Sequence, residues 1–147
     1  MSEVVLCGNS STGMTQSEDQ KQLNLYAEDY KVLSIRNGLM VIYSRISRTK
    51  GSDTASASTL TLPLGGVLFE ITGNADINYI TTTGWSEGSA LNLIVRDGFT
   101  FKHNTANPPA GTSPLKLSGN VDFVAAADAT LSVIWNGSYW YEMGRKI

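Results

Sequence analysis

Charged residues, cysteines and long apolar runs are all scarce in this chain. Only 16% of its 147 residues are charged, the formal net charge is −2, and no block of like charges occurs. This composition argues against nucleic acid or an anionic membrane surface as the main partner. Every apolar run is too short to span a bilayer. Because Cys7 is the single cysteine, an intrachain disulfide and a zinc site built on cysteines are both excluded.

Targeting and cofactor signals are also missing. Residues 1–20 lack the basic start and apolar core of a secretory signal peptide. We therefore expect the protein to be made in a cytoplasm and kept there until it is assembled or released. No Gly-rich phosphate loop follows a strand and opens a helix, and Gly65, Gly66 and Gly111 are better explained as turn residues. We expect no cofactor and no bound metal.

Strand and turn residues take the place of the missing charges. Ser and Thr fill the deficit, and they suit strands and turns better than helices. Asn136-Gly137 stands between two strand-like runs, and Asn37-Gly38 and Asp97-Gly98 repeat the pattern. Asn-Gly is the strongest short hairpin signal, because both central residues of a type I′ turn need a positive φ. These signals predict an all-β chain built from antiparallel hairpins.

The N-terminal third differs in composition from the rest. Residues 1–24 are rich in Ser, Gly and Gln and contain one short apolar run with Val4, Val5 and Leu6. This segment predicts an extended arm that folds poorly alone, and we expect these three residues to anchor it. Residues 23–33 could form one or two helical turns. The predicted organisation is an N-terminal attachment arm with the first hairpin (1–50), a linker (51–58) and a C-terminal domain (59–147).

The C-terminal domain shows turn signals about every eight to twelve residues, the spacing of a sandwich or barrel. Residues 104–114 contain three prolines and predict a stiff, exposed loop. We expect an antiparallel β-sandwich or jelly-roll-like domain. Its candidate strands are residues 59–63, 67–72, 76–81, 91–96, 99–103, 115–118, 121–124, 130–135 and 138–143.

One heptapeptide pattern occurs twice, at residues 71–77 and 117–123, and both copies contain Gly-Asn-x-Asp. Asn and Asp side chains can hold tight turns by bonding nearby backbone groups, which favours a pair of similar turns. The alternative is that the Asn and Asp oxygens bind a hard cation. Calcium needs six to eight oxygens, and neither copy has a dense carboxylate cluster, so we favour the turns.

A series of short motifs runs through the C-terminal domain in a defined order. Ser-Thr-Leu-Thr-Leu-Pro at 58–63 precedes a Gly-Gly turn, and Phe-Glu-Ile-Thr-Gly follows at 69–73. A His-Asn pair stands at 103–104, and the series ends with Trp-Tyr-Glu-Met-Gly-Arg at 140–145. In this order, residues 57–145 resemble a recurrent module of bacteriophage virion proteins, found at the C-terminus of tail fibres and tail spikes.

The resemblance implies a small β-sandwich-like domain that assembles as a homotrimer on a phage particle. Residues 91–95 and 130–135 are apolar on both faces in places, as expected where one face packs in the protomer and the other against a neighbour. The implied partners are further copies of the chain and a major capsid or tail protein. The implied location is the virion, after assembly in the host cytoplasm.

Catalytic residues are few. His103 is the single histidine, so any Ser–His triad would depend on it, and we expect its imidazole to bond backbone groups at a strand end. The carboxylates of the domain stand in or next to turns, where solvated or capping roles are the default. The sequence leaves a glycosidase pair open. In enzymatic spikes that carry the module, however, the active site lies in an upstream shaft. We expect a non-enzymatic protein.

Three non-enzymatic functions remain open. The first is a capsid decoration or head-fibre protein that holds the shell through residues 1–50. The second is a short tail fibre or tail-tip receptor-binding protein that contacts host surface polysaccharide through aromatic residues, with Trp85, Tyr139 and Tyr141 as candidates. The third is a carbohydrate-binding module of a cellular enzyme. The sequence favours the first and does not separate it from the second.

Overall fold

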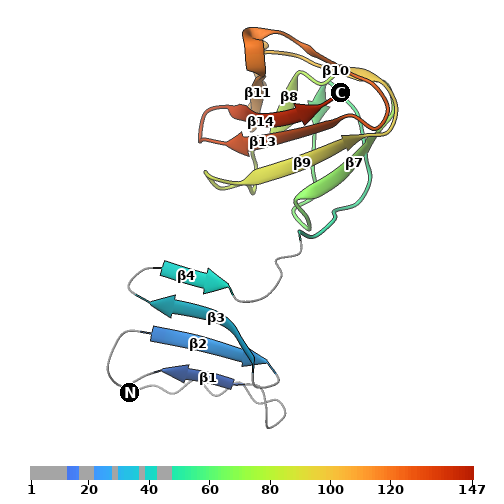
Figure 1. Ribbon diagram of the computed structural model, residues 1–147. Coiled ribbons are helices and arrows are strands. Elements are labelled where there is room, and N and C mark those ends of the chain that lie inside the picture. The colour runs from blue at the N-terminus through green and yellow to red at the C-terminus, as the bar shows by residue number, and fades with distance from the viewer. Residues whose placement is uncertain (1–12, 17–21, 28–29, 37–38, 43–47) are drawn as a thin grey trace. The chain divides into compact units, whose positions relative to one another are not determined.

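The computed structural model describes residues 13–16, 22–27, 30–36, 39–42 and 48–147. The chain divides into two units, Met1–Ser47 and Arg48–Ile147. The described residues form fourteen strands and one short 3-10 turn, so the predicted all-β class is confirmed (Figure 1). Within these residues no helix is long and apolar enough to cross a membrane.

The first unit contains a four-stranded antiparallel sheet whose spatial order follows the chain. Its strands are β1 (Gly13–Gln16), β2 (Gln22–Ala27), β3 (Tyr30–Arg36) and β4 (Leu39–Ile42). Arg36 pairs with Leu39, so the hairpin predicted around Asn37-Gly38 is confirmed, although the two turn residues lie outside the described residues. Val4, Val5 and Leu6 of the predicted arm also lie outside them.

The helical turns expected within residues 23–33 are wrong, because β2 and β3 occupy this segment. Leu23 and Leu25 alternate with polar residues, which is the period of a strand rather than a helix. Tyr26 and Ala27, part of the segment expected to be helical, end β2 and pair with Lys31 and Tyr30 of β3. Strand pairing therefore outweighed local helix propensity.

The second unit has one eight-stranded sheet, in the order β5-β7-β9-β13-β14-β11-β8-β6, and one two-stranded sheet, β10-β12. Its elements are β5 (Thr54–Ala55), β6 (Thr59–Leu60), β7 (Leu68–Thr72), β8 (Tyr79–Thr81), β9 (Ala90–Val95), β10 (Phe99–Phe101), β11 (Thr112–Lys116), the 3-10 turn η1 (Ser118–Asn120), β12 (Phe123–Ala125), β13 (Thr130–Trp135) and β14 (Trp140–Lys146).

The large sheet is mixed rather than purely antiparallel. Strand pairs β5–β7, β7–β9, β6–β8 and β11–β14 are parallel. Strand pairs β9–β13, β13–β14 and β8–β11 are antiparallel. Parallel neighbours need a crossover connection instead of a tight turn. Between β7 and β9 the chain makes such a crossover through β8, which lies near the opposite end of the sheet order.

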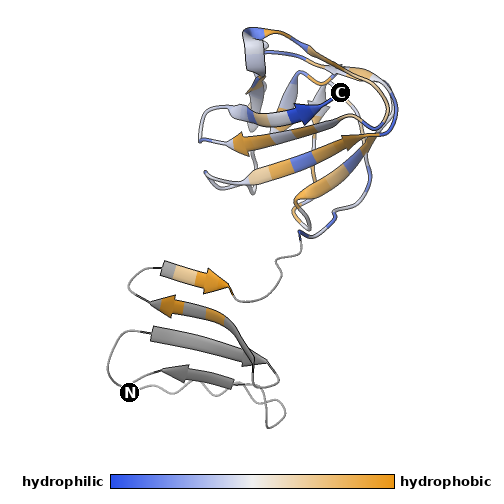
Figure 2. Cartoon of the chain, viewed as in Figure 1, coloured by the Kyte–Doolittle hydropathy of each residue, from blue (hydrophilic) through white to orange (hydrophobic). Residues whose placement is uncertain are grey.

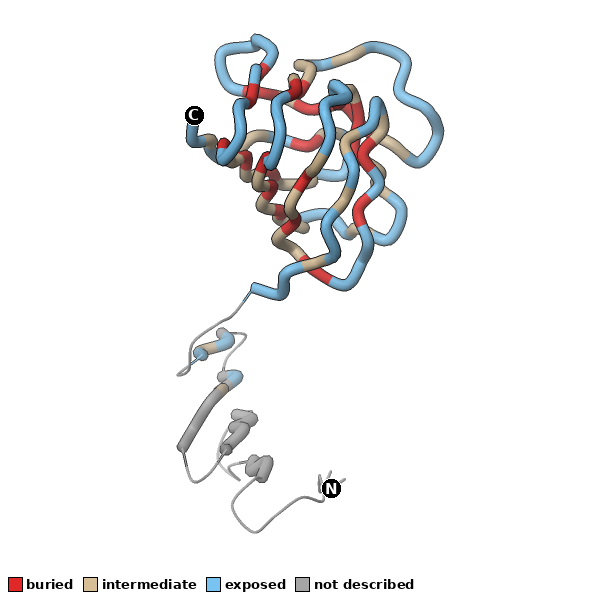
Figure 3. Tube along the Cα trace, turned by 90° about the vertical axis from the view of Figure 1, so that its right-hand side faces the viewer, coloured by how far each residue is buried: buried red, intermediate tan, exposed pale blue. Residues whose placement is uncertain are grey.

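The core is enclosed by the two ends of the large sheet, which lie on opposite sides of it. Along β9 and β13 buried and half-buried residues alternate, so one face of each strand points inward. Phe69 and Leu93 from one half of the sheet share a single core cluster with Ile80 and Leu115 from the other half. Figure 3 shows the buried positions along the inner strands and the exposed loops around them. This is the sheet-rich, sandwich-like domain that the sequence predicts.

The link at Asp97-Gly98 is not a hairpin, contrary to the prediction. β9 pairs with β7 and β13, whereas β10 pairs with β12, so this link passes from one sheet to the other. The Asp97 carboxylate accepts a hydrogen bond from the Gly73 amide at 2.5 Å. Asp97 thus ties the link to a distant loop instead of forming a tight two-residue turn.

The hairpin at Asn136-Gly137 is confirmed, but its turn differs from type I′. Trp135 pairs with Trp140, so four residues connect β13 to β14. Gly137 has φ = 90°, whereas Asn136 is absent from the positive-φ residues of the described chain. Instead, Asn136 Oδ1 accepts the amide hydrogens of Ser138 and Tyr139, at 3.0 and 2.8 Å. A side-chain oxygen closes this turn, as Asn commonly does.

The segment expected as a linker, 51–58, belongs to the second unit. β5 pairs with β7, and the Ser56 amide donates to the Thr72 carbonyl at 2.6 Å. Glu70 of β7 also accepts ion pairs from Lys50, at 3.1 Å, and Arg96, at 2.7 Å. The hydrogen bonds from Arg96 and then Lys50 lower the pKa of Glu70 to about 2. These contacts join the segment to the sheet, so the division between units falls before Arg48.

The predicted proline-rich loop is shorter than residues 104–114. β11 begins at Thr112 and includes Pro114, which is buried opposite Tyr79. The pairing of β11 passes at this point from β8 to β14, whose first partner is Leu115. Proline lacks an amide hydrogen, and the change of partner strand is a position where the ladder tolerates that loss.

Candidate functional site

The outward face of β14 carries a pair of tyrosines. Along this strand Trp140 is buried and Tyr141 is 40% exposed, because successive side chains point to opposite faces. Tyr139 precedes Trp140 and lies against Tyr141, with ring centroids 6.1 Å apart and ring planes at 80°. The structure therefore brings together two of the three residues predicted to contact a glycan.

Lys116 of β11 completes this surface. The parallel pairing of β11 with β14 sets Lys116 opposite Tyr141. Its ammonium lies 4.5 Å from the centroid of the Tyr139 ring, a cation–π contact. Among the described residues Lys116 forms no ion pair, unlike Lys102 and Arg145. We call Lys116, Tyr139 and Tyr141 the Tyr–Lys surface.

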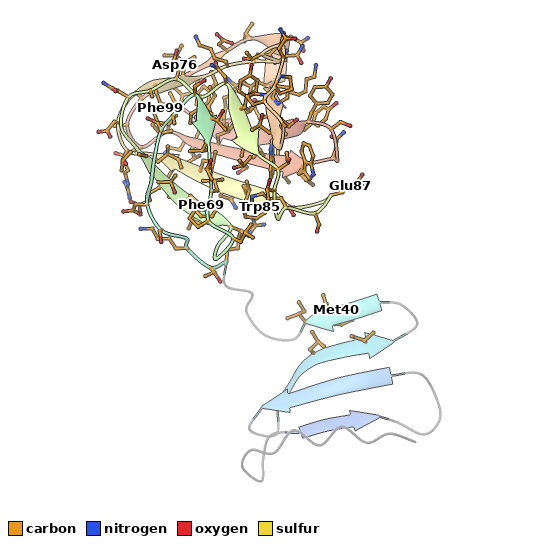
Figure 4. The ribbon with its side chains drawn as sticks, turned by 180° about the vertical axis from the view of Figure 1, so that it is seen from behind. Met40, Phe69, Asp76, Trp85, Glu87 and Phe99 are labelled. Atoms are coloured by element: carbon orange, nitrogen blue, oxygen red, sulfur yellow. The ribbon has the colours of Figure 1, made fainter. Side chains whose placement is uncertain are left out.

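Trp85, the third predicted contact residue, is not part of this surface. It is half-buried, packs against the core and meets Trp140 edge to face, with ring centroids 6.3 Å apart. Since Trp140 points inward and Tyr141 outward, Trp85 lies on the opposite side of β14 from the tyrosines. In Figure 4, Glu87 marks the outer tip of the same loop. Trp85 serves to close the core at this end.

The carboxylates of the domain bind backbone amides from distant segments. Four of them share this contact: Asp76 with Thr100 at 2.8 Å, Asp97 with Gly73 at 2.5 Å, Asp122 with His103 at 2.7 Å and Glu142 with Ser118 at 2.8 Å. The expectation was a capping role within local turns. The capping is found, but each carboxylate joins two segments at least 19 residues apart in sequence.

The repeated Gly-Asn-x-Asp pattern forms two turns on either side of β10. The glycine of each copy, Gly73 or Gly119, has a positive φ. Asp76 and Asp122 each contact the Lys102 ammonium, at 3.2 and 3.3 Å. Backbone hydrogen bonds, followed by Lys102, lower the pKa of both carboxyls. The favoured interpretation as paired turns is confirmed, and the chain's own ammonium occupies the position proposed for a hard cation. No group of three or more metal-binding side chains occurs in the described residues.

Of the ion pairs in the described part of the chain, the most buried joins Glu142 to Arg145 at the end of β14. Their carboxylate and guanidinium form two contacts, of 2.7 and 2.6 Å, and the side chains are only 5% and 18% exposed. Arg145 also lies over the Phe123 ring, 4.5 Å from its centroid. Burial raises the pKa of Glu142, but hydrogen bonds from Arg145 and the Ser118 amide together lower it by more. The resulting pKa is therefore below the ordinary 4.5. This pair fastens β14 to η1.

His103 is hydrogen-bonded through both its main chain and its imidazole ring. Its amide donates to Asp122, and its Nδ1 accepts the Leu117 amide hydrogen at 3.0 Å. The expectation that the imidazole bonds backbone groups at this strand end is confirmed. The hydrogen bond that joins Asp122 to His103 goes to the main-chain amide of His103.

The β3–β4 hairpin of the first unit has an apolar face. Leu33 pairs with Ile42, and Ile35 pairs with Met40, so these four side chains lie on one side of the hairpin. Ile35, Ile42 and especially Met40, at 57%, are exposed. Figure 2 shows hydrophobic colour on the described parts of β3 and β4. We call Leu33, Ile35, Met40 and Ile42 the hairpin face.

Sequence reasoning missed Lys116 and the hairpin face. Lys116 has no local signal, since its position beside Tyr141 depends on a parallel pairing between segments far apart in the chain. Within the predicted hairpin the alternation of Leu33, Ser34 and Ile35 was readable, whereas residues 40–42 are all apolar, so the sequence alone did not indicate which face stays exposed. Comparison of the chain with family models, curated proteins and solved structures finds no match in any of the three.

Proposed function

We propose that this chain is a non-enzymatic structural protein of a bacteriophage virion, a trimeric capsid decoration or head-fibre protein attached through its first unit. The observation that carries the proposal is the exposed hairpin face on a distinct N-terminal unit. Exposed apolar faces of this kind commonly mark protein–protein contact sites. The motif order in residues 57–145 supplies the phage context by resemblance.

The attachment role follows because, among the described residues, no layer fully covers the hairpin face. One side of a sheet normally packs on a core, and an isolated hairpin or small sheet with an open apolar face gains stability when a partner covers it. A major capsid or tail protein is the partner that we propose. Val4, Val5 and Leu6 would add apolar contacts to the same attachment.

The second unit supports a display role rather than catalysis. Its core is continuous, and most of its carboxylates hold backbone amides or cations of their own chain. A general acid or base needs to be free to exchange a proton with a substrate. The side chains that could perform chemistry are therefore better explained as fasteners of a stable domain.

The attachment proposal predicts that deletion of Met1–Ser47 leaves the second unit folded and abolishes incorporation into particles. The measurement is cryo-microscopy of intact virions that carry a label at the C-terminus of this protein, with the full-length chain as the control. We expect a label on the capsid that projects outward. Normal decoration by the truncated protein would show that attachment lies elsewhere, and a label at the tail would replace decoration with the tail-fibre function.

The trimer proposal predicts a mass in solution near three times 15.8 kDa, measured by light scattering on the purified protein. Ile94 of β9 lies half-buried on the outward face of the large sheet, opposite Thr130 of β13, where a neighbouring copy could cover it. Replacing it by Thr should weaken the trimer without disturbing the inward face. If the parent protein stays monomeric at micromolar concentration, the trimer in solution is rejected, and a trimer could form only during assembly on the particle.

A second candidate function is contact with host surface polysaccharide, as a short tail fibre or tail-tip protein. The Tyr–Lys surface favours it, because the exposed Tyr141, the half-buried Tyr139 and a nearby cation supply both a flat apolar area and polar groups. A carbohydrate-binding module would use the same surface. Imaging separates these functions, since only the first two place the protein on a virion.

A further inference from the structure

We infer that the Tyr–Lys surface binds an acidic saccharide, a sugar chain that carries carboxylates, and that Lys116 selects for the charge. The inference rests on the second candidate function, glycan contact, and names the class of glycan. The surface combines two rings that contact each other at 6.1 Å with an ammonium 4.5 Å from one of them. Each part supplies a different element of recognition.

The tyrosines supply the contact area. Their planes are nearly perpendicular, at 80°, so one ring presents its face where the other presents its edge. Tyrosine is rigid, loses little conformational entropy on binding, and offers a hydroxyl as well as an apolar ring. Tyr141 is 40% exposed on the outward face, whereas Trp140 between the two tyrosines is fully buried and fixes their backbone. The rings are thus held ready for a flat, partly apolar ligand such as a sugar ring.

Lys116 supplies the charge. A ring quadrupole attracts an ammonium but does not neutralise it, so the full positive charge of Lys116 remains available to an anion. The ammonium also has three hydrogen-bond donors, and the ring can satisfy only the side that faces it. Lys50, Arg96, Lys102 and Arg145 are all in ion pairs with carboxylates of their own chain, whereas Lys116 is in none among the described residues.

The local charge agrees with an acidic ligand. Glu142 follows Tyr141 in the same strand, but its side chain points inward to Arg145 and the Ser118 amide. A second lysine that forms no ion pair among the described residues, Lys146 of β14, also lies on the outward side, where it pairs in register with Thr130. Glu87 is the carboxylate near the turn, against Gly137, and its charge should oppose an anionic ligand rather than help it.

The test uses the full-length protein and three immobilised acidic polysaccharides, namely alginate, hyaluronate and polysialic acid. Each is compared with its own carboxyl-reduced form, which keeps the sugar chain and loses the charge. We expect the acidic form of at least one pair to bind about tenfold more tightly than its reduced form, the size of one charge-assisted hydrogen bond. Lys116→Gln should remove this preference, and Tyr141→Ala should weaken binding to both forms.

Lys146→Gln is the matched control, because it removes the same charge from the same sheet outside the Tyr–Lys surface. It should change affinity less than twofold, and Glu87→Gln should leave affinity equal or higher. An equal loss in Lys146→Gln and Lys116→Gln would overturn the inference in favour of nonspecific attraction. Binding to a reduced form without preference for its acidic form would also overturn it, while glycan contact would stand. Binding to none of the six would reject both.

Discussion

Trp140→Ala is expected to lower the free energy of unfolding by about 3–5 kcal/mol, the usual cost of removing a large aromatic side chain from a packed core. Trp140 is fully buried in β14, between β13 and β11, and its ring contacts Trp85 and Trp135, with centroids 6.3 and 5.4 Å away. The residual cavity would open where the two halves of the large sheet meet. Urea unfolding followed by circular dichroism measures the loss.

Tyr141→Ala is the matched control, because it removes a ring from the next position on the outward face of the same strand. It should cost much less than Trp140→Ala. Trp140→Phe should fall between them, since it keeps a ring and also removes an indole N–H that has no hydrogen-bond partner among the described residues. If Trp140→Ala costs no more than Tyr141→Ala, the assignment of Trp140 to the core is wrong.

Glu142→Gln is expected to cost about 3–5 kcal/mol, because removing one partner of a buried ion pair leaves the other charge uncompensated. The amide group of glutamine would turn donors toward the Arg145 guanidinium, which has only donors to offer. The Ser118 amide would compete for the one remaining oxygen. Unfolding in urea at neutral pH gives the size of the effect, and Glu87→Gln, at the exposed loop tip, is the control expected to stay within about 0.5 kcal/mol.

The pH dependence of the difference in unfolding free energy between the parent protein and Glu142→Gln provides an independent check. The folded-state pKa of Glu142 lies below the ordinary 4.5, so its ionised form stabilises the fold above that pH. As the pH falls through the lowered pKa, the carboxyl takes up a proton and the contribution is lost. The gap between the parent protein and Glu142→Gln should therefore narrow below pH 4.5. A gap that stays constant into strong acid would contradict the ion-pair explanation.

The fold was predictable from the sequence where its contacts are local. Residues 130–135 were predicted as a strand and form β13, and the strands around Asn136-Gly137 pair as a hairpin. Prediction failed where the partner is distant. Asp97-Gly98 carries a hairpin signal, yet its flanking strands pair elsewhere because β9 is held between β7 and β13. Parallel pairs such as β11–β14 leave no signal in either strand.

In the candidate site, too, local contacts were predictable from the sequence and distant ones were not. Tyr139 and Tyr141 are two residues apart, and a strand places such residues on one face, so their proximity was readable from the sequence. Trp85 is also aromatic and stands in a segment with glycines on both sides, so the sequence predicted it to be exposed like the tyrosines. Its contact with Trp140 is set by packing between loop and strand, and the sequence of the loop does not encode that packing locally.

The position of β14 has a consequence for the order of folding. This strand is the single link in the large sheet between the β5-β7-β9-β13 half and the β11-β8-β6 half. The hydrogen-bonded connection between the halves therefore cannot form until β14 has been synthesised, and every other strand of the unit precedes β14 in the chain. Until then both halves expose unpaired strand edges, which are open to pairing with other chains. Closure of the large sheet is in this sense a late event in the synthesis of the chain.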